Sequence, residues 1–435
     1  MRSYPEKKHS YSAVAILTLA QVFAFIDRQI PSMLVEPIKQ DFNLTDSQIA
    51  LLGGAAFSIF YAIMALPIGY AVDRYQRTKV LGTGIFLWSL MTALAGLANS
   101  FGKLFGARIG VAVGEAVMAP TSVSLISDSF PENKQGKPMG IITSGVYIGI
   151  GTTLLGGGFL IDYLTEIGGI NLPLIGNLKP WQATFMIVGI PGLILALAAF
   201  FLKEPKRIEE QINLNIGSDK KNIFHHLKDH KNTLIPMFGG LIFMALIFYS
   251  FSFWAPTMMI RAFDISLSEV GLILGIITII SSITGTILAG TAVDYLRNKN
   301  YTDAPVRAAM IAVMLALPPI ISLSFINSEI GAWICIALYL LFISSFAPLG
   351  LLAISGVSTG NVKGQAAAIH AFLMMAFGLS LGPQLTAFFT DFIFADPNLL
   401  IYSISLSGLV VLPISALFFK ISLPRYRESS QKILT

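Results

Sequence analysis

The sequence predicts an all-α membrane protein with twelve transmembrane helices in two parallel six-helix repeats. The 435 residues are 54% hydrophobic and only 12% charged, with a mean hydropathy of +0.71, whereas a soluble domain carries about 25% charged residues. Apolar runs of about 20 residues, the length that crosses a bilayer, recur along the chain. A short motif also follows both the second and the eighth of these runs.

Turn residues and charges divide the apolar runs into two sets of six. The first six predicted spans are 12–36, 47–72, 79–99, 103–127, 137–161 and 181–202. The second six are 232–260, 266–293, 305–325, 330–357, 364–390 and 398–421. One long polar stretch separates the sets. We therefore predict an N-terminal six-helix bundle over 1–202, a cytoplasmic linker over 203–231 and a C-terminal six-helix bundle over 232–435.

The distribution of lysine and arginine predicts the orientation. If the N-terminus is cytoplasmic, 23 of the 29 lysine and arginine residues fall on the cytoplasmic side and four on the opposite side. The remaining two are Arg28 and Arg108, inside spans. Loops rich in these residues stay in the cytoplasm. We expect a multi-pass protein of the cell's inner (plasma) membrane, with both termini in the cytoplasm.

Composition and motifs exclude several classes of function. The net charge of +5 comes from cytoplasmic loops and not from a basic surface, so we expect no nucleic-acid partner. The single cysteine, Cys335, allows no intrachain disulfide and no thiolate metal site. No phosphate-binding loop and no H-E-x-x-H motif is present. We therefore expect no enzyme, no catalytic residue, no metal and no cofactor, and the apolar composition makes the lipid bilayer a partner.

Four charged residues lie inside the first and fourth spans: Asp27, Arg28, Arg108 and Glu115. A charge at the centre of a membrane helix costs about 2.5–3.5 kcal/mol, so four unpaired charges would cost roughly 10–14 kcal/mol. Arg108 and Glu115 are seven residues apart and share one helix face. The two spans run in opposite directions, which can bring all four residues to a similar depth. We therefore predict a buried ionic network facing a central cavity.

The residue types suggest a division of roles in this network. Asp27 and Glu115 are the candidates for proton coupling, because burial and a neighbouring arginine act in opposite directions on a carboxylate. Arginine does not release its proton. We expect Arg108 to contact an anionic group of the substrate and Arg28 to hold Asp27 or Glu115. The alternative is a static network that only fixes the packing of the two helices.

A repeated motif ends the second and eighth spans. The first copy contains Gly69, Asp73, Arg74 and Arg77, and the second copy contains Gly290 and Asp294. Both copies would lie on the cytoplasmic side after an even-numbered span, as parallel six-helix repeats require. We expect the first copy to act as a gate, with Asp73 facing the N-terminal end of the eleventh span. The alternative is a set of ordinary charges at the membrane surface.

These motifs resemble the major facilitator superfamily over nearly the whole chain. The pattern G-x-x-x-D-R-x-x-R is met by Gly69, Asp73, Arg74 and Arg77. The pattern R-x-x-x-x-x-G-E is met by Arg108, Gly114 and Glu115. Within the superfamily, the stretches around Phe25–Arg28 and Gly114–Ala116 are most similar to the Spinster family. The resemblance implies the major facilitator fold and a gate that closes the cytoplasmic side in the outward-open state.

The resemblance implies a secondary active transporter that works by alternating access and is driven by protons. We expect a monomer whose partners are a small-molecule substrate, protons and the lipid bilayer. The Spinster resemblance implies an amphipathic substrate, lysolipid-like or sphingoid-like. The alternatives are a proton-coupled symporter of organic anions or sugar acids and, more remotely, a non-transporting membrane receptor. Candidates for lining the cavity are Tyr147, Trp254, Tyr339 and His370, although a lone histidine such as His370 is more often a packing residue.

Overall fold

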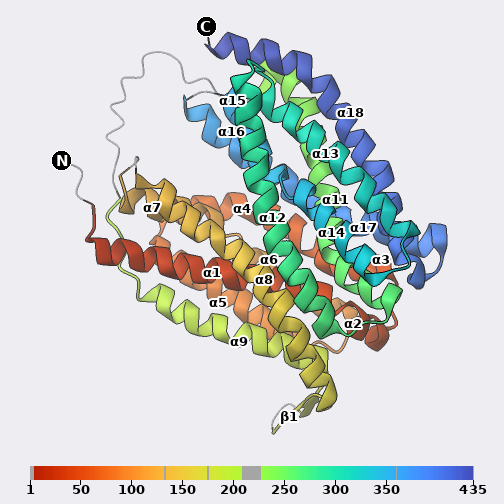
Figure 1. Ribbon diagram of the computed structural model, residues 1–435. Helices are drawn as coiled ribbons and strands as arrows, with labels where there is room; N and C mark the ends of the chain where they lie inside the picture. Colours follow the sequence, from red (N-terminus) through yellow and green to blue (C-terminus); the bar gives the residue numbers. More distant parts are fainter. Residues whose placement is uncertain (1–3, 132–133, 174–175, 208–226, 359, 435) are drawn as a thin grey trace. The chain divides into compact units, whose positions relative to one another are not determined.

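The computed structural model describes residues 4–131, 134–173, 176–207, 227–358 and 360–434 (Figure 1). Within these ranges, 12 helices or helix pairs are long and apolar enough to cross a membrane, from Lys7–Met33 to Pro397–Gln431. The predicted all-α class with twelve spans is confirmed. Residues 208–226, which make up most of the predicted linker, lie outside the described residues, so the linker stays a prediction.

The chain forms two compact units. The first comprises Met1–Gly217 together with Ser266–Gly275, and the second comprises Ser218–Ile265 together with Ile276–Thr435. The start of the eighth span thus belongs to the first unit: the backbone N–H of Ser268 donates to the Asp162 carboxylate at 2.9 Å.

The first unit contains nine helices among its described residues, apart from the start of α12, and a short hairpin. The helices are α1 (Lys7–Met33), α2 (Val35–Phe42), α3 (Asp46–Gly53), α4 (Ala55–Arg74), α5 (Arg77–Ala95), α6 (Phe101–Glu115), α7 (Met118–Ser129), α8 (Gly136–Glu166) and α9 (Pro180–Phe200). Strands β1 (Ile170–Leu172) and β2 (Gly176–Leu178) pair antiparallel between α8 and α9. Helix α1 packs along α8, and α5 packs along α9 (Figure 1). A Cβ added at Gly149 of α8 would lie 2.8 Å from the Phe25 Cβ, so only glycine allows this close approach.

Two spans of the first unit are broken at the depth of the predicted charges. The second span breaks between α3 and α4 at Gly54, and the fourth breaks between α6 and α7 directly after Glu115. Carbonyl groups at the end of a helix lack an intrahelical partner and need another donor. Breaks in membrane helices are tolerated where they are buried in protein or line a cavity.

The second unit contains the remaining described helices. These are α11 (Lys231–Phe263), α12 (Leu267–Asn298, whose first residues belong to the first unit), α13 (Ala304–Ser322), α14 (Glu329–Ile343), α15 (Phe346–Val357), α16 (Gly360–Leu373), α17 (Ser380–Phe388) and α18 (Leu400–Leu434). Two π-helical segments, η3 (Met374–Leu379) and η4 (Phe389–Phe394), interrupt the eleventh span, and 3-10 turns η2 (Leu323–Phe325) and η5 (Pro397–Leu399) complete the unit. Helix α11 packs along α18, and α13 packs against α14 and α18 (Figure 1).

Candidate functional site

An ion pair joins the first and fourth spans inside the first unit. The Nε of Arg28 on α1 donates to the Glu115 Oε2 on α6 at 2.6 Å. The Glu115 side chain is fully buried, whereas the Arg28 side chain keeps 16% of its surface exposed. Arg28 is therefore the member of the pair that remains partly accessible.

Three aromatic rings surround the guanidinium of Arg28. Its Cζ lies 4.7 Å from the ring centroids of both Phe25 and Phe57, and 5.1 Å from that of Tyr61. A guanidinium over the face of an aromatic ring gains cation–π attraction, which is stronger away from water. The rings thus help to stabilise this charge in the interior of the membrane protein.

Arg108 on α6 is 1% exposed and binds backbone carbonyls. Its Nη1 donates to the Asp27 carbonyl at 2.9 Å, and its Nε donates to the Leu52 carbonyl at 3.4 Å. The residue four positions after Asp27 is Pro31, which has no N–H for that carbonyl. Leu52 lies in the last turn of α3, before the break at Gly54. Both acceptors are therefore carbonyls that their own helices leave free.

The structure brings all four predicted charges together in the first unit. The Asp27 carboxylate is 2% exposed and interacts electrostatically with both Arg108 and Glu115. Three buried atoms of this cluster have no hydrogen-bond partner within the described part of the chain: Asp27 Oδ1, Arg108 Nη2 and Glu115 Oε1. With two arginines and two carboxylates, the cluster is neutral when all four are ionised. A bound proton would make it cationic.

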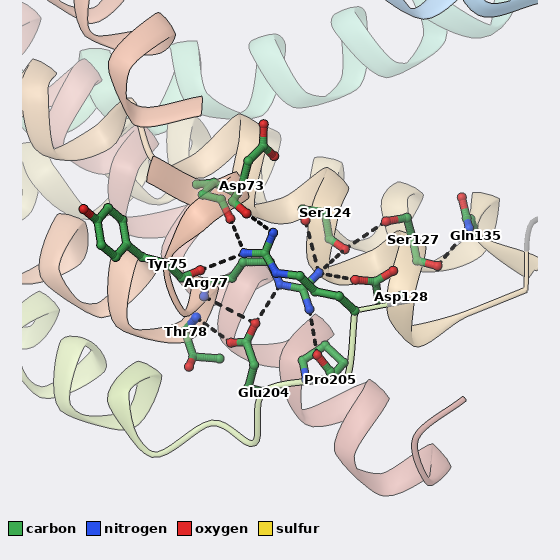
Figure 2. Close-up of polar contacts among 12 residues, drawn as sticks. Asp73, Tyr75, Arg77, Thr78, Ser124, Ser127, Asp128, Gln135, Glu204 and Pro205 are labelled. Atoms are coloured by element: carbon green, nitrogen blue, oxygen red, sulfur yellow. Dashed lines mark hydrogen bonds and ion pairs between the residues drawn. The ribbon is translucent and has the colours of Figure 1, made fainter. Parts of the chain in front are cut away.

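A second polar cluster surrounds Arg77, the last arginine of the predicted gating motif (Figure 2). Arg77 begins α5 and is fully buried. Its guanidinium pairs with Asp128 at the end of α7, and its Nε donates to Glu204 beyond α9 at 2.7 Å. Further bonds reach the carbonyls of Ser124 at 3.0 Å and Pro205 at 2.7 Å. Arg77 therefore fastens the ends of the fourth and sixth spans to the start of the third.

Two residues of this region cap helix ends. The Glu204 carboxylate accepts from the backbone N–H groups of Arg77 and Thr78 at 3.3 and 2.9 Å, at the start of α5. A carboxylate at a helix N-terminus satisfies free N–H groups and the helix dipole. Burial alone would raise the pKa of Glu204, but the hydrogen bonds from Arg77 and Thr78 outweigh it and lower the pKa below its ordinary value. Arg207 donates to the carbonyls of Val72, Asp73 and Tyr75 at the end of α4.

The other residues of the repeated motif lie on exposed helix ends. The Asp73 and Asp294 side chains are exposed, and the Arg74 guanidinium lies 4.3 Å from the Tyr70 ring centroid. A Cβ added at Gly69 or Gly290 would meet no atom of the described residues within 4 Å. Close packing within their own units therefore does not explain these two glycines. The gating role of the motif stays a prediction.

The second unit has a charge cluster at the start of its third helix. Asp303 precedes α13 and is fully buried. It accepts from Arg307 at 3.1 Å and from Arg427 on α18 at 2.7 Å. In each unit, therefore, an ion pair links the start of the third span to the end of the sixth span. The signs are reversed, because a buried arginine is central in the first unit and a buried aspartate in the second.

The remaining predicted residues differ in burial. Trp254 and Tyr339 are fully buried in the second unit and donate to the carbonyls of Pro383 at 2.9 Å and Ile247 at 3.1 Å. His370 is 4% exposed and stacks on the Phe238 ring at 6.4 Å. Tyr147 on α8 is half-buried. The cavity-lining role of these four residues stays a prediction.

Comparison with known proteins identifies the family. The model of the Major Facilitator Superfamily matches residues 17–429. The chain belongs to the Major Facilitator Superfamily. The predicted superfamily is thus confirmed, and with it the class of a membrane transporter rather than an enzyme.

Individual superfamily members resemble the chain over most of its length. An MFS-type efflux pump of Mycolicibacterium smegmatis is 26% identical over 388 residues, covering 88% of this chain and 85% of the pump. A probable L-galactonate transporter of Escherichia coli is 26% identical over 73% of this chain and 68% of its own. The crystal structure of a bacterial homologue of the human lysosomal transporter Spinster superposes with a TM-score of 0.80 at 24% identity, covering 99% and 98% of the two chains. The predicted likeness to Spinster proteins is found as well.

Several residues of the two polar clusters were not predicted from the sequence. Glu204 and Arg207 follow the sixth span, where polar residues are expected in any case. Phe57 and Tyr61 are four residues apart on one face of α4, a spacing that could have indicated a ring pair. Pro31 could have indicated the free Asp27 carbonyl, since the missing N–H follows from the sequence alone.

Proposed function

We propose that this Major Facilitator Superfamily transporter moves an amphipathic small molecule, lysolipid-like or sphingoid-like with an acidic headgroup, by alternating access and together with protons. The observation that carries the proposal is the buried cluster of Asp27, Arg28, Arg108 and Glu115. Buried charges in a membrane protein are rare, and in transporters they mark ion and substrate pathways.

Protons and substrate would be coupled through the net charge of this cluster. One proton on Asp27 or Glu115 leaves one arginine without a matching negative charge. The acidic headgroup of a substrate can then balance that arginine. Proton and anion would thus each favour the binding of the other, and such coupling is reciprocal. Asp27 Oδ1 and Glu115 Oε1, which have no partner among the described atoms, are the positions for the proton.

We assign Arg28 to the headgroup, whereas the sequence alone favoured Arg108 for this contact. Its side chain is 16% exposed, whereas Arg108 is 1% exposed and engaged with two carbonyls. Phe25, Phe57 and Tyr61 beside Arg28 offer an apolar surface next to the charge. A charge bordered by aromatic rings suits a molecule that is itself part polar and part apolar. A relative that is 24% identical over 74% of this chain, the sphingosine-1-phosphate transporter SPNS2 of Danio rerio, supports this substrate class.

A second candidate is the symport of a sugar acid. The probable L-galactonate transporter of Escherichia coli is 26% identical over 73% of this chain. A sugar acid would use the same arginine and the same proton site as a lysolipid-like substrate. It would differ in that it does not need the aromatic surface. In either case the distribution of lysine and arginine supports cytoplasmic termini in the inner membrane of the cell.

Uptake into proteoliposomes that contain the purified protein tests the proposal. Uptake of a radiolabelled lysophospholipid is compared with that of galactonate, with and without an inward proton gradient. We expect the gradient to stimulate lysophospholipid uptake, and expect Asp27→Asn or Glu115→Gln to remove the stimulation. Glu166→Gln, at an exposed carboxylate, is the control. Stimulated uptake of galactonate alone would favour the second candidate, and gradient-independent uptake of both would refute proton coupling.

A further inference from the structure

Each unit has an apolar groove between its second, third and fourth spans. The α5 groove has a volume of about 570 Å³ and lies between α4, α5 and the junction of α6 with α7. The α13 groove has a volume of about 460 Å³ and lies between α12, α13, α14 and α15. Volumes of this size are typical of sites for small molecules. The two grooves occupy equivalent places in the two repeats.

The walls of both grooves are apolar and partly formed by small residues. Leu87 and Val113 line the α5 groove, and Gly84 and Gly114 deepen it where α5 crosses α6. Leu288 and Leu315 line the α13 groove, and they are 49% and 47% exposed. Among the described residues, no aspartate or glutamate lines either groove. Such walls suit a hydrocarbon chain.

One end of each groove carries a tyrosine and a lysine four residues apart. Tyr75 and Lys79 both line the α5 groove. Tyr295 lines the α13 groove, and the Lys299 Nζ lies 4.5 Å from the centroid of its ring. Both lysines are exposed, and neither has an ion-pair partner within the described parts of the chain. Each follows an even-numbered span, and the predicted topology assigns both lysines to the cytoplasmic side.

We propose that each groove binds one anionic phospholipid of the bilayer, with an acyl chain along the apolar wall and the phosphate at Lys79 or Lys299. An uncompensated cation at the end of an apolar groove matches the charge and the shape of such a lipid. The tyrosine would sit at the level of the headgroups, where aromatic side chains with a polar tip are favoured. Asp294 directly precedes Tyr295, and Asp73 lies two residues before Tyr75, but neither aspartate is among the described residues that line the grooves.

Lipid binding in the two grooves would be independent of the transported substrate. In the α5 groove a bound lipid would lie close to the buried cluster, because Gly114 directly precedes Glu115. A lipid in this groove would contact the rear of the helix that carries Glu115 and Arg108. The bound lipid would therefore support the packing of the site from the side of the bilayer.

Native mass spectrometry of the detergent-purified full chain tests this proposal. The protein is titrated with phosphatidylglycerol and, separately, with phosphatidylcholine of the same acyl chains. We expect up to two phosphatidylglycerol molecules to be retained, and roughly fivefold weaker retention of phosphatidylcholine. Lys79→Gln and Lys299→Gln should each weaken one of the two binding steps by about the same factor. Lys103→Gln, at an exposed lysine outside both grooves, is the charge control.

Variants that fill the grooves test the place of the acyl chain. Thr83→Phe and Ala292→Phe enlarge exposed residues of the α5 and α13 grooves, and Leu94→Phe enlarges an exposed residue of α5 outside the groove. We expect each filling variant to lose one lipid and the Leu94 variant to lose none. Lys79→Arg and Lys299→Arg, which keep the positive charge, should preserve binding. Equal retention of both lipids, or wild-type binding by the lysine and filling variants, would overturn the proposal.

Discussion

The guanidinium of Arg108 donates a hydrogen bond of 2.9 Å to the backbone carbonyl of Asp27, a group that Pro31 leaves without its usual partner within the helix. A missing N–H on one span thus provides the acceptor for a charged side chain on another. The bond fixes Arg108 beside the carboxylate of the same aspartate. The position of the charge in the site therefore depends on a proline that carries no charge itself.

Replacement of Arg108 by methionine should strongly destabilise the first unit. Methionine keeps the apolar stem but leaves the Asp27 and Leu52 carbonyls without this donor and the two carboxylates with one cation. Breaking a buried ion pair from one side costs about 3–5 kcal/mol. We expect a clear fall in the melting temperature of the purified protein, measured by its intrinsic fluorescence. Lys103→Met, at an exposed position, should change it little.

Replacement of Arg28 by lysine should impair transport although the charge is retained. Lysine is a compact cation and cannot lie flat against the rings of Phe25, Phe57 and Tyr61 while it bonds Glu115. We expect the KM for an anionic substrate to rise by about tenfold, since one or two such contacts are worth about 1–2 kcal/mol. Initial rates of uptake measure the change. Arg297→Lys, an exposed replacement, should behave as the wild type, and an unchanged KM at Arg28→Lys would rule out the headgroup role.

Glu204 should make the stability of the first unit depend on pH in the acidic range. Its pKa is lowered in the folded protein because the hydrogen bonds from Arg77 and Thr78 outweigh the effect of burial. A group with a lowered folded pKa stabilises the fold above its unfolded value of 4.5, and this stabilisation is lost as the pH falls through the folded pKa. Glu204→Gln should lower the melting temperature at pH 7 and reduce its decline in acid. Equal acid sensitivity of Glu204→Gln and wild type would contradict this role, with Glu166→Gln as the control.

The two arginines at Asp303 should compensate for each other. Either Arg307 or Arg427 alone can neutralise the buried carboxylate, but loss of both leaves a buried charge without a partner. We expect modest effects of Arg307→Gln and Arg427→Gln, and a double variant less stable than the sum by about 0.5–3 kcal/mol. Chemical unfolding in mild detergent provides the four stabilities of the cycle. Simple additivity would show that the two pairs are independent.

The sequence allows much of the fold to be predicted, because the bilayer imposes a length of about 20 apolar residues on every span. The four charges could be placed together for a similar reason, since an unpaired charge inside a span is too costly to keep. The partners of Arg77 could not be predicted in this way. Asp128 and Glu204 are 51 and 127 residues away in the sequence, and polar residues after a span carry no signal of their partner. Their contacts depend on how three helix ends meet.

The two π-helical segments of the eleventh span each contain one residue more per turn than an α-helix. Each wide turn, Met374–Leu379 and Phe389–Phe394, holds an extra residue compared with an α-helical turn. If a wide turn became α-helical, the following part of the helix would rotate by about 100°, and its backbone hydrogen bonds would be kept. Gly378 and Gly382, which face α11 closely, lie on either side of the end of the first wide turn. A change of one wide turn to an α-helical turn would therefore reorient only the part of the span beyond it, while the contacts of Gly378 and Gly382 with α11 would hold the neighbouring part in place.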